Sequence, residues 1–367
     1  MNWISKKFLI DLLLIGVFSI LIFSAINALF VYYSPSIVKL IPSEVLRNIS
    51  PCYRTLFHKE NGSLEYVNYV FGDSFSEGSG DEFLDNDKEY GIFNKLEDTG
   101  STELVFGRGG YGNIGTLIEF EHCYPLLSRY TSIDASLTER YHVTFVFYEG
   151  NDLNNNLVEE GREFNEVKYK IRFLLPLYEY AYNQIRSLAA KIFQKTTNLP
   201  ESKAVELTGD FPVTSSGIQF EEYPQSAATE LSNEDFETSL SILASVLKQI
   251  HAQLPAAENY MLLYLPAVAS SYSFENELRV QSYTGKNFFS TTNEFNVQRH
   301  ETIVNSLRQL TSNIGWFLCD TTPDILAQTG QGIPVHGPRD WKHFNKIGYG
   351  IVANAYEVCL NTERRDN

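Results

Sequence analysis

This 367-residue chain contains the three residue types of a serine nucleophile site: a serine, a histidine and an aspartate. Ser74 ends the tripeptide Gly72-Asp73-Ser74, and Asp340 stands three positions before His343. A serine hydroxyl is a weak nucleophile until a neighbouring imidazole takes its proton, and a carboxylate beside that imidazole fixes its orientation. These three residue types therefore predict acyl chemistry through Ser74.

Two further segments offer hydrogen-bond donors for such a reaction. The loop Gly107–Gly112 exposes backbone N–H groups, and Gly150-Asn151-Asp152 adds a side-chain amide. Donors of both kinds hold the oxyanion of a tetrahedral intermediate, each lowering the barrier by about 3–4 kcal/mol. The same loop also fits G-x-G-x-x-G, the pattern of a dinucleotide site. No strand ending in an acidic residue follows about 20 residues later, so a nucleotide site is the weaker interpretation.

Short runs of β-branched and aromatic residues precede the first three of these segments, and another precedes the Asp340/His343 segment at a greater distance. Such runs alternating with helical patterns predict an α/β fold with an open parallel sheet, covered on both faces, whose ligands bind at the carboxyl ends of the strands. The expected strands cover residues 66–71, 103–106, 142–148, 259–265 and 315–319, and the expected helices cover 113–128, 168–194, 233–253, 297–312 and 345–361.

In chain order, the four segments resemble blocks I, II, III and V of the SGNH (GDSL) hydrolases, and the resemblance spans about residues 66–360. It implies a flavodoxin-like three-layer α/β/α fold with a five-stranded parallel sheet. It also implies action on ester bonds without a metal or an organic cofactor. By this resemblance Ser74 is the nucleophile, His343 is the general base and Asp340 orients the base.

The resemblance further implies an oxyanion hole formed by the Ser74 N–H, the Gly110 N–H and the Asn151 side chain. Gly110 is assigned by its offset from Gly112. The second block departs from the family at Val105, where the family commonly has asparagine. No G-x-S-x-G sequence occurs in the chain, which argues against an α/β-hydrolase elbow.

The N-terminus has the pattern of a membrane anchor. No charged residue occurs from Leu12 to Val38, a run longer than the roughly 20 residues that span a bilayer. The chain is therefore divided into a tip at 1–7, a transmembrane anchor at 8–34, a tether at 35–64 and a domain at 65–367. Lys6 and Lys7 predict that the tip is cytoplasmic, which makes the domain extracytoplasmic. The alternative is a cleaved signal peptide, for which Ile26-Asn27-Ala28 is a poor cleavage site.

Composition restricts the partners of the chain. With 29 Lys+Arg against 45 Asp+Glu and a net charge of −16, it lacks the basic surface that nucleic acid requires.

Four cysteines lack metal-ligand spacing and are first interpreted as buried small hydrophobic residues, with their pairing left open: Cys52, Cys123, Cys319 and Cys359. Residues 153–232 are interpreted as an insertion beside the rim of the site.

The leading hypothesis is a membrane-anchored serine esterase that removes acyl groups, acetyl above all, from a cell-surface or exported glycan. An O-acyltransferase of the same chemistry is the alternative, because water and a sugar hydroxyl both attack an acyl-serine. A lipase or thioesterase and a catalytically silent glycan-binding protein are further alternatives. Tyr111 and Trp341 are candidates to stack on a sugar ring, although core packing is the more ordinary role for such rings.

Overall fold

The computed structural model describes residues 22, 66–80, 92, 101–107, 109–130, 141–161, 211–275, 277–283 and 287–366. Contacts divide the chain into two compact units. One unit comprises Met1–Phe57, His122–Tyr130 and Asn165–Leu207, and the other comprises His58–Glu121, Thr131–Phe164 and Thr208–Asn367. The second unit contains the main sheet and every predicted site residue.

Most of the N-terminal prediction lies outside the described residues. Within the described residues, no helix has the length and apolar character needed to cross a bilayer. The predicted anchor at 8–34 is described only at residue 22, and the predicted tether at 35–64 and helix at 168–194 are not described.

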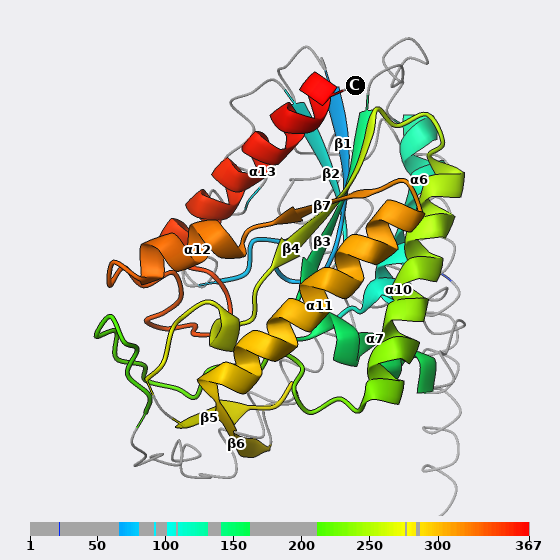
Figure 1. The fold of residues 1–367 in the computed structure, drawn as a ribbon. Coiled ribbons are helices and arrows are strands. Elements are labelled where there is room, and N and C mark those ends of the chain that lie inside the picture. Colours follow the sequence, from blue (N-terminus) through cyan, green and yellow to red (C-terminus); the bar gives the residue numbers. More distant parts are fainter. Residues whose placement is uncertain are drawn as a thin grey trace, which may run out of the picture. The chain divides into compact units, whose positions relative to one another are not determined.

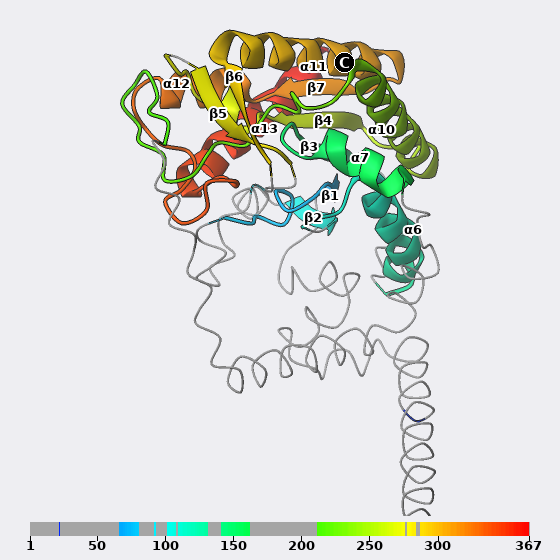
Figure 2. The same cartoon turned by 90° about the horizontal axis from the view of Figure 1, so that it is seen from below.

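The main sheet has five parallel strands, which confirms that part of the predicted fold. Their spatial order is β2-β1-β3-β4-β7, and Figure 2 shows the strands in this order from β2 at the bottom of the sheet to β7 at the top. Both β3 and β4 are buried at every position, as expected for central strands covered on two faces. The strands are β1 (Tyr66–Phe71), β2 (Ser101–Phe106), β3 (Tyr141–Tyr148), β4 (Asn259–Leu265) and β7 (Phe317–Asp320).

Helices cover both faces of this sheet, with α13 on one side and α10 and α11 on the other (Figure 1). Four of the five expected helices lie in the described residues and are present: α6 (Asn113–Tyr130), α10 (Asn233–Gln253), α11 (Asn293–Asn313) and α13 (Lys346–Asp366). The remaining elements were not predicted: α7 (Asp152–Gly161), α12 (Thr322–Thr329), the 3-10 turn η2 (Val268–Ser270) and the antiparallel pair β5 (Glu277–Gln281) and β6 (Phe288–Thr292).

Local sequence signals explain where these helices begin. Ser232 caps α10 by accepting a hydrogen bond from the Asp235 N–H, and Thr292 caps α11 in the same way. At α13, the Asn345 side-chain oxygen accepts from the N–H groups of Ile347 and Gly348. Each cap satisfies backbone donors that have no partner within their own helix.

The strand order reverses direction at β1, which is where open α/β sheets bind ligands. From β1 the chain passes outward to β2, and it then returns to the opposite side of β1 to form β3. At such a reversal the connections leave in opposite directions, so we expect a ligand beyond the carboxyl ends of β1 and β3. Phe71 is in register with Phe106 on β2 and with Phe145 on β3. The segments after these strands are therefore neighbours.

A disulfide joins β7, the last strand of the sheet, to α13, the last described helix. Cys319 on β7 bonds to Cys359 on α13, with their Cα atoms 5.9 Å apart. Cys319 is buried as expected, and the pairing that the sequence left open is thus given for these two cysteines. The strand and helix that carry them were both expected, but their pairing depends on how α13 packs against β7, which the sequence does not specify.

Gly107 allows the loop after β2 to approach the loop after β1. Its φ is +129°, and a Cβ added there would lie 1.6 Å from the Gly72 carbonyl oxygen. The Gly72 N–H donates to the Phe106 carbonyl at 3.1 Å across the same contact. Two of the predicted site segments therefore meet backbone to backbone, and only glycine fits at position 107.

We predict that Gly107→Ala lowers the free energy of unfolding by about 3 kcal/mol or more, because strain and a backbone clash coincide there. Gly217 is the matched control, since its φ is +86° but no atom lies within 4 Å of an added Cβ. Gly217→Ala is expected to cost only about 1–2 kcal/mol of conformational strain. Urea unfolding of the two variants measures both costs, and equal costs would contradict the assigned contact.

Candidate active site

Ser74, His343 and Asp340 form a continuous hydrogen-bonded chain. The Ser74 Oγ lies 2.8 Å from the His343 Nε2, and the His343 Nδ1 lies 2.7 Å from the Asp340 Oδ2. Ser74 follows β1 and is buried, whereas the side chains of His343 and Asp340 are 22% and 21% exposed. The structure thus brings together the three residues expected to carry the chemistry, and they lie at the carboxyl edge of the sheet.

The spacing between Asp340 and His343 follows from a local turn. The Asp340 Oδ1 accepts hydrogen bonds from the Lys342 N–H at 2.9 Å and the His343 N–H at 3.2 Å. These bonds point the Oδ2 toward the imidazole. Burial raises the pKa of Asp340, but the hydrogen bond and charge of His343 outweigh burial and lower that pKa to about 2. Asp340 is therefore an ionised acceptor at any ordinary pH.

An ionised Asp340 determines which nitrogen of His343 carries the proton. A carboxylate only accepts hydrogen bonds, so the Nδ1 is the donor toward Asp340. The Nε2 of the neutral ring is then free to accept the Ser74 hydroxyl proton. The Phe75 ring packs against His343 at a centroid distance of 4.9 Å and against Tyr148 at 4.1 Å, which limits rotation of the imidazole.

His336 is buried close to this site but is a poor alternative base. Burial lowers its pKa to about 3, so the ring stays neutral and weakly basic. Its Nδ1 lies 3.0 Å from the Tyr272 hydroxyl, and that hydroxyl accepts from the Val335 and His336 N–H groups. The Tyr272 proton is therefore donated to the ring, which makes His336 a packing residue of the loop before Asp340.

Asn151 is held against the serine loop by the residue beside the serine. Its Nδ2 donates to the Asp73 Oδ2 at 2.7 Å, which uses one of the two amide hydrogens. Asp73 also accepts from the Phe75 N–H at 2.9 Å, and burial raises its pKa. The sequence drew attention to Ser74 in this tripeptide and gave no role to Asp73. Its role of orienting Asn151 becomes visible only when β1 and β3 are adjacent.

The loop with Gly110 lies beside Ser74. A Cβ added at Gly109 would be 3.5 Å from the Ser74 Cβ, and the Gly109 N–H donates to the Glu77 side chain at 2.9 Å. Gly110 has a φ of +80°. The N–H groups of Ser74 and Gly110 have no protein acceptor within the described part of the chain. The assignment of Ser74, Gly110 and Asn151 to an oxyanion hole therefore stays a prediction.

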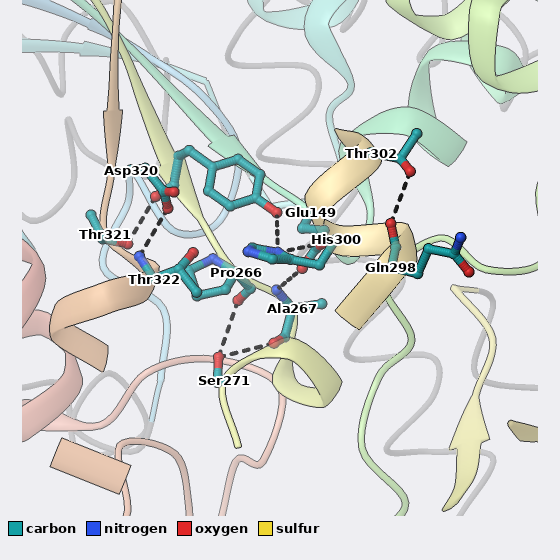
Figure 3. A network of polar contacts seen from close by, with 11 residues as sticks. Glu149, Pro266, Ala267, Ser271, Gln298, His300, Thr302, Asp320, Thr321 and Thr322 are labelled. Atoms are coloured by element: carbon teal, nitrogen blue, oxygen red, sulfur yellow. Dashed lines mark hydrogen bonds and ion pairs between the residues drawn. The ribbon is translucent and has the colours of Figure 1, made fainter. Parts of the chain in front are cut away.

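A second polar network ties together the carboxyl ends of β3 and β4 (Figure 3). Glu149, which immediately precedes Gly150, accepts from the Ala267 N–H at 2.7 Å and lies 3.1 Å from the His300 Nδ1. The Tyr264 hydroxyl also lies 3.0 Å from that nitrogen. Burial raises the pKa of Glu149, but its contact with His300 outweighs burial and lowers it, while the same contact raises the pKa of His300. The sequence gave His300 no role.

The two rings considered as sugar-stacking candidates lie in the core. Trp341 and Tyr111 are buried, and Trp341 packs on Phe220 at a centroid distance of 4.6 Å, in agreement with the core interpretation. Among the residues that the structure describes, no group of three or more His, Cys, Asp and Glu has the arrangement of a metal site.

The low pKa of Asp340 predicts an acid-dependent contribution to stability. Its folded pKa of about 2 lies below the unfolded value near 3.9, so the contribution is present above about pH 4 and is lost as the pH falls toward 2. The difference in unfolding free energy between the wild type and Asp340→Asn should therefore shrink between about pH 5 and 2 in urea titrations. A difference that is independent of pH over this window would contradict the pairing with His343.

No protein-family model matches the chain, and no curated protein matches it. Among solved structures, it is similar to the crystal structure of LAE5, an alpha/beta hydrolase enzyme from the metagenome of Lake Arreo, Spain, with 10% identity and a TM-score of 0.36 over 81% of this chain and 94% of that chain. It is also similar to an acetyl xylan esterase, AlAXEase, with 12% identity and a TM-score of 0.32 over 80% of this chain and 99% of that chain. At TM-scores this low, neither similarity assigns the chain to a family or a function.

Proposed function

We propose that this protein is a serine-dependent ester hydrolase that forms an acyl-serine intermediate. The observation that carries the proposal is the aligned pair of contacts from Ser74 to His343 and from His343 to Asp340, at 2.8 and 2.7 Å. A positioned base within hydrogen-bond reach of a hydroxyl, itself oriented by a carboxylate, is the arrangement that activates serine. A silent binding protein has no need for all three side chains in this geometry.

In this proposal the Ser74 Oγ attacks the ester carbonyl carbon while its proton passes to the His343 Nε2. Asp340 stabilises the resulting imidazolium without taking its proton. The carbonyl oxygen becomes an oxyanion and accepts from the Ser74 N–H, the Gly110 N–H and the Asn151 amide. The alcohol then leaves with the proton from His343, and the acyl group remains on Ser74.

A second nucleophile completes the reaction. Water attacks the acyl-serine with His343 again acting as base, which releases the acid and regenerates the Ser74 hydroxyl. A sugar hydroxyl in place of water gives an O-acylated glycan by the same steps. No cofactor is required, because every proton transfer uses groups in the site.

We further propose that the fold is a membrane-anchored SGNH-type domain working outside the cytoplasm on acylated glycans. The strand order β2-β1-β3-β4-β7, which is 2-1-3-4-5 counted over the parallel strands, supports a flavodoxin-like sheet. The Cys319–Cys359 disulfide supports an oxidising compartment. The uncharged run from Leu12 to Val38 supports a membrane anchor.

The proposal predicts that the purified full-length chain hydrolyses p-nitrophenyl acetate. Ser74→Ala should lower kcat by about 1,000-fold or more, because no other group replaces the nucleophile. Ser76→Ala is the control, since the Ser76 hydroxyl donates to the Asp73 carbonyl at 2.7 Å rather than facing His343. This control should keep kcat within about tenfold of the wild type. A wild type no faster than Ser74→Ala would rule out the esterase proposal for this ester.

Hydrolysis and transfer are distinguished by the fate of the acyl group. The wild type is incubated with an acetylated glycan, and released acetate is measured beside acetyl groups moved to an unacetylated oligosaccharide. The proposal predicts that free acetate is the main product. Predominant acetylation of the oligosaccharide would instead identify an O-acyltransferase.

A further inference from the structure

The N-terminus of α6 is capped entirely by side chains from another helix. The Gly112 carbonyl accepts the first helical hydrogen bond from the Thr116 N–H at 3.1 Å, so Gly112 is the capping position. The N–H groups at the start of a helix have no partners within the helix and need outside acceptors. The acceptors here come from α7, through Glu159 and Asn156.

Glu159 provides most of this cap. Its Oε1 accepts from the Gly112 N–H at 2.8 Å, and its Oε2 accepts from the Ile114 and Gly115 N–H groups at 3.1 and 3.2 Å. The Asn156 side chain accepts the remaining donor from Asn113 at 3.3 Å. A buried carboxylate with three N–H donors at the positive end of a helix is strongly favoured in its ionised form.

This contact also explains the glycine pattern that resembles a dinucleotide site. A Cβ added at Gly112 would lie 2.5 Å from the Glu159 Oε2 and 2.9 Å from the Asn155 Cβ. Glycine is therefore needed at position 112 for α7 to approach. The N–H groups that would hold a phosphate already bind the carboxylate of Glu159, which removes the basis of the nucleotide interpretation.

The helix that carries Glu159 begins at the other proposed oxyanion donor. The Asn151 carbonyl accepts from the Asn155 N–H at 2.8 Å in the first turn of α7. One turn further from the start, the Asn155 side chain donates to the Tyr111 carbonyl at 3.2 Å. Asn151 therefore stands at the first end of α7, while Glu159 near the other end holds the loop that contains Gly110.

We propose that Glu159 is a positioning residue that sets the distance between the two oxyanion donors Gly110 and Asn151. This inference rests on the proposed esterase function and adds to it a residue that does not touch the substrate. A rigid helix fixed at both ends holds the donors where charge develops in the transition state. Loss of the cap releases the loop 107–112 while the bonds among Ser74, His343 and Asp340 are unchanged.

The test compares Glu159→Gln with Glu160→Gln in the full-length chain, using p-nitrophenyl acetate. Glu160 is the matched control because it is the next residue of α7 and is exposed. Glutamine at position 159 keeps the size of the side chain, but it replaces one acceptor oxygen with an amide donor that faces an N–H group. We expect kcat to fall by about 10- to 100-fold with KM within about threefold, because oxyanion donors act mainly in the transition state.

Further readouts separate positioning from loss of fold. The rising limb of the kcat–pH profile should keep its midpoint, since His343 and Asp340 are untouched, and the fraction of folded protein at the assay temperature should match the wild type. Glu159→Leu removes both acceptors and should lose more activity than Glu159→Gln. If the leucine variant does not fold, Glu159→Gln alone decides.

Each outcome has one interpretation. If Glu159→Gln retains the kcat of Glu160→Gln, or if its activity falls only as the folded fraction falls, the positioning role is overturned. A rise in KM at constant kcat also overturns it. A wild type without Ser74-dependent activity is a different failure, because it removes the proposed function before Glu159 is tested.

Discussion

The hydrogen bond between Ser74 and His343 joins residues separated by 269 positions, and most of the second unit is needed to make it. Ser74 is placed by the end of β1, which the flanking strands β2 and β3 hold in the sheet. His343 is placed by the loop before α13, which Asn345 anchors by accepting from the first N–H groups of that helix. The distance of 2.8 Å is thus a property of the whole sheet and its last helix, rather than of either motif alone.

Buried carboxylates dominate the polar structure of this edge, and each has partners that offset the cost of removing it from water. Asp73 accepts from Asn151 and Phe75, and Glu149 accepts from Ala267 beside His300. Glu159 accepts from the N–H group of Gly112 and from two N–H groups in the first turn of α6. These groups lie on the segments that follow β1 and β3. The same contacts that make burial of these charges tolerable therefore also orient the loops that carry the candidate catalytic residues.

Features with a local pattern were predictable from the sequence. The boundaries of β1, β4 and α10 agree with expectation because apolar runs and caps define them residue by residue. The turn that pairs Asp340 with His343 spans three positions and is local too. Glu159 acts on a glycine 47 positions earlier, and His300 acts on Glu149 across 151 positions. No periodicity marks such pairs, so these partners emerge only when α7 meets the start of α6 and α11 packs on the strand ends.

Among the serines that the structure describes, Ser74 is the one hydrogen-bonded to an imidazole that a carboxylate orients, and we propose that it is therefore the activated serine. A fluorophosphonate reagent measures this directly, since it transfers its phosphonyl group to an activated serine and its product is stable to mass spectrometry of peptides. We expect one adduct per chain, located on Ser74 and absent from His343→Ala. An adduct on another serine, or none in the folded wild type, would contradict it.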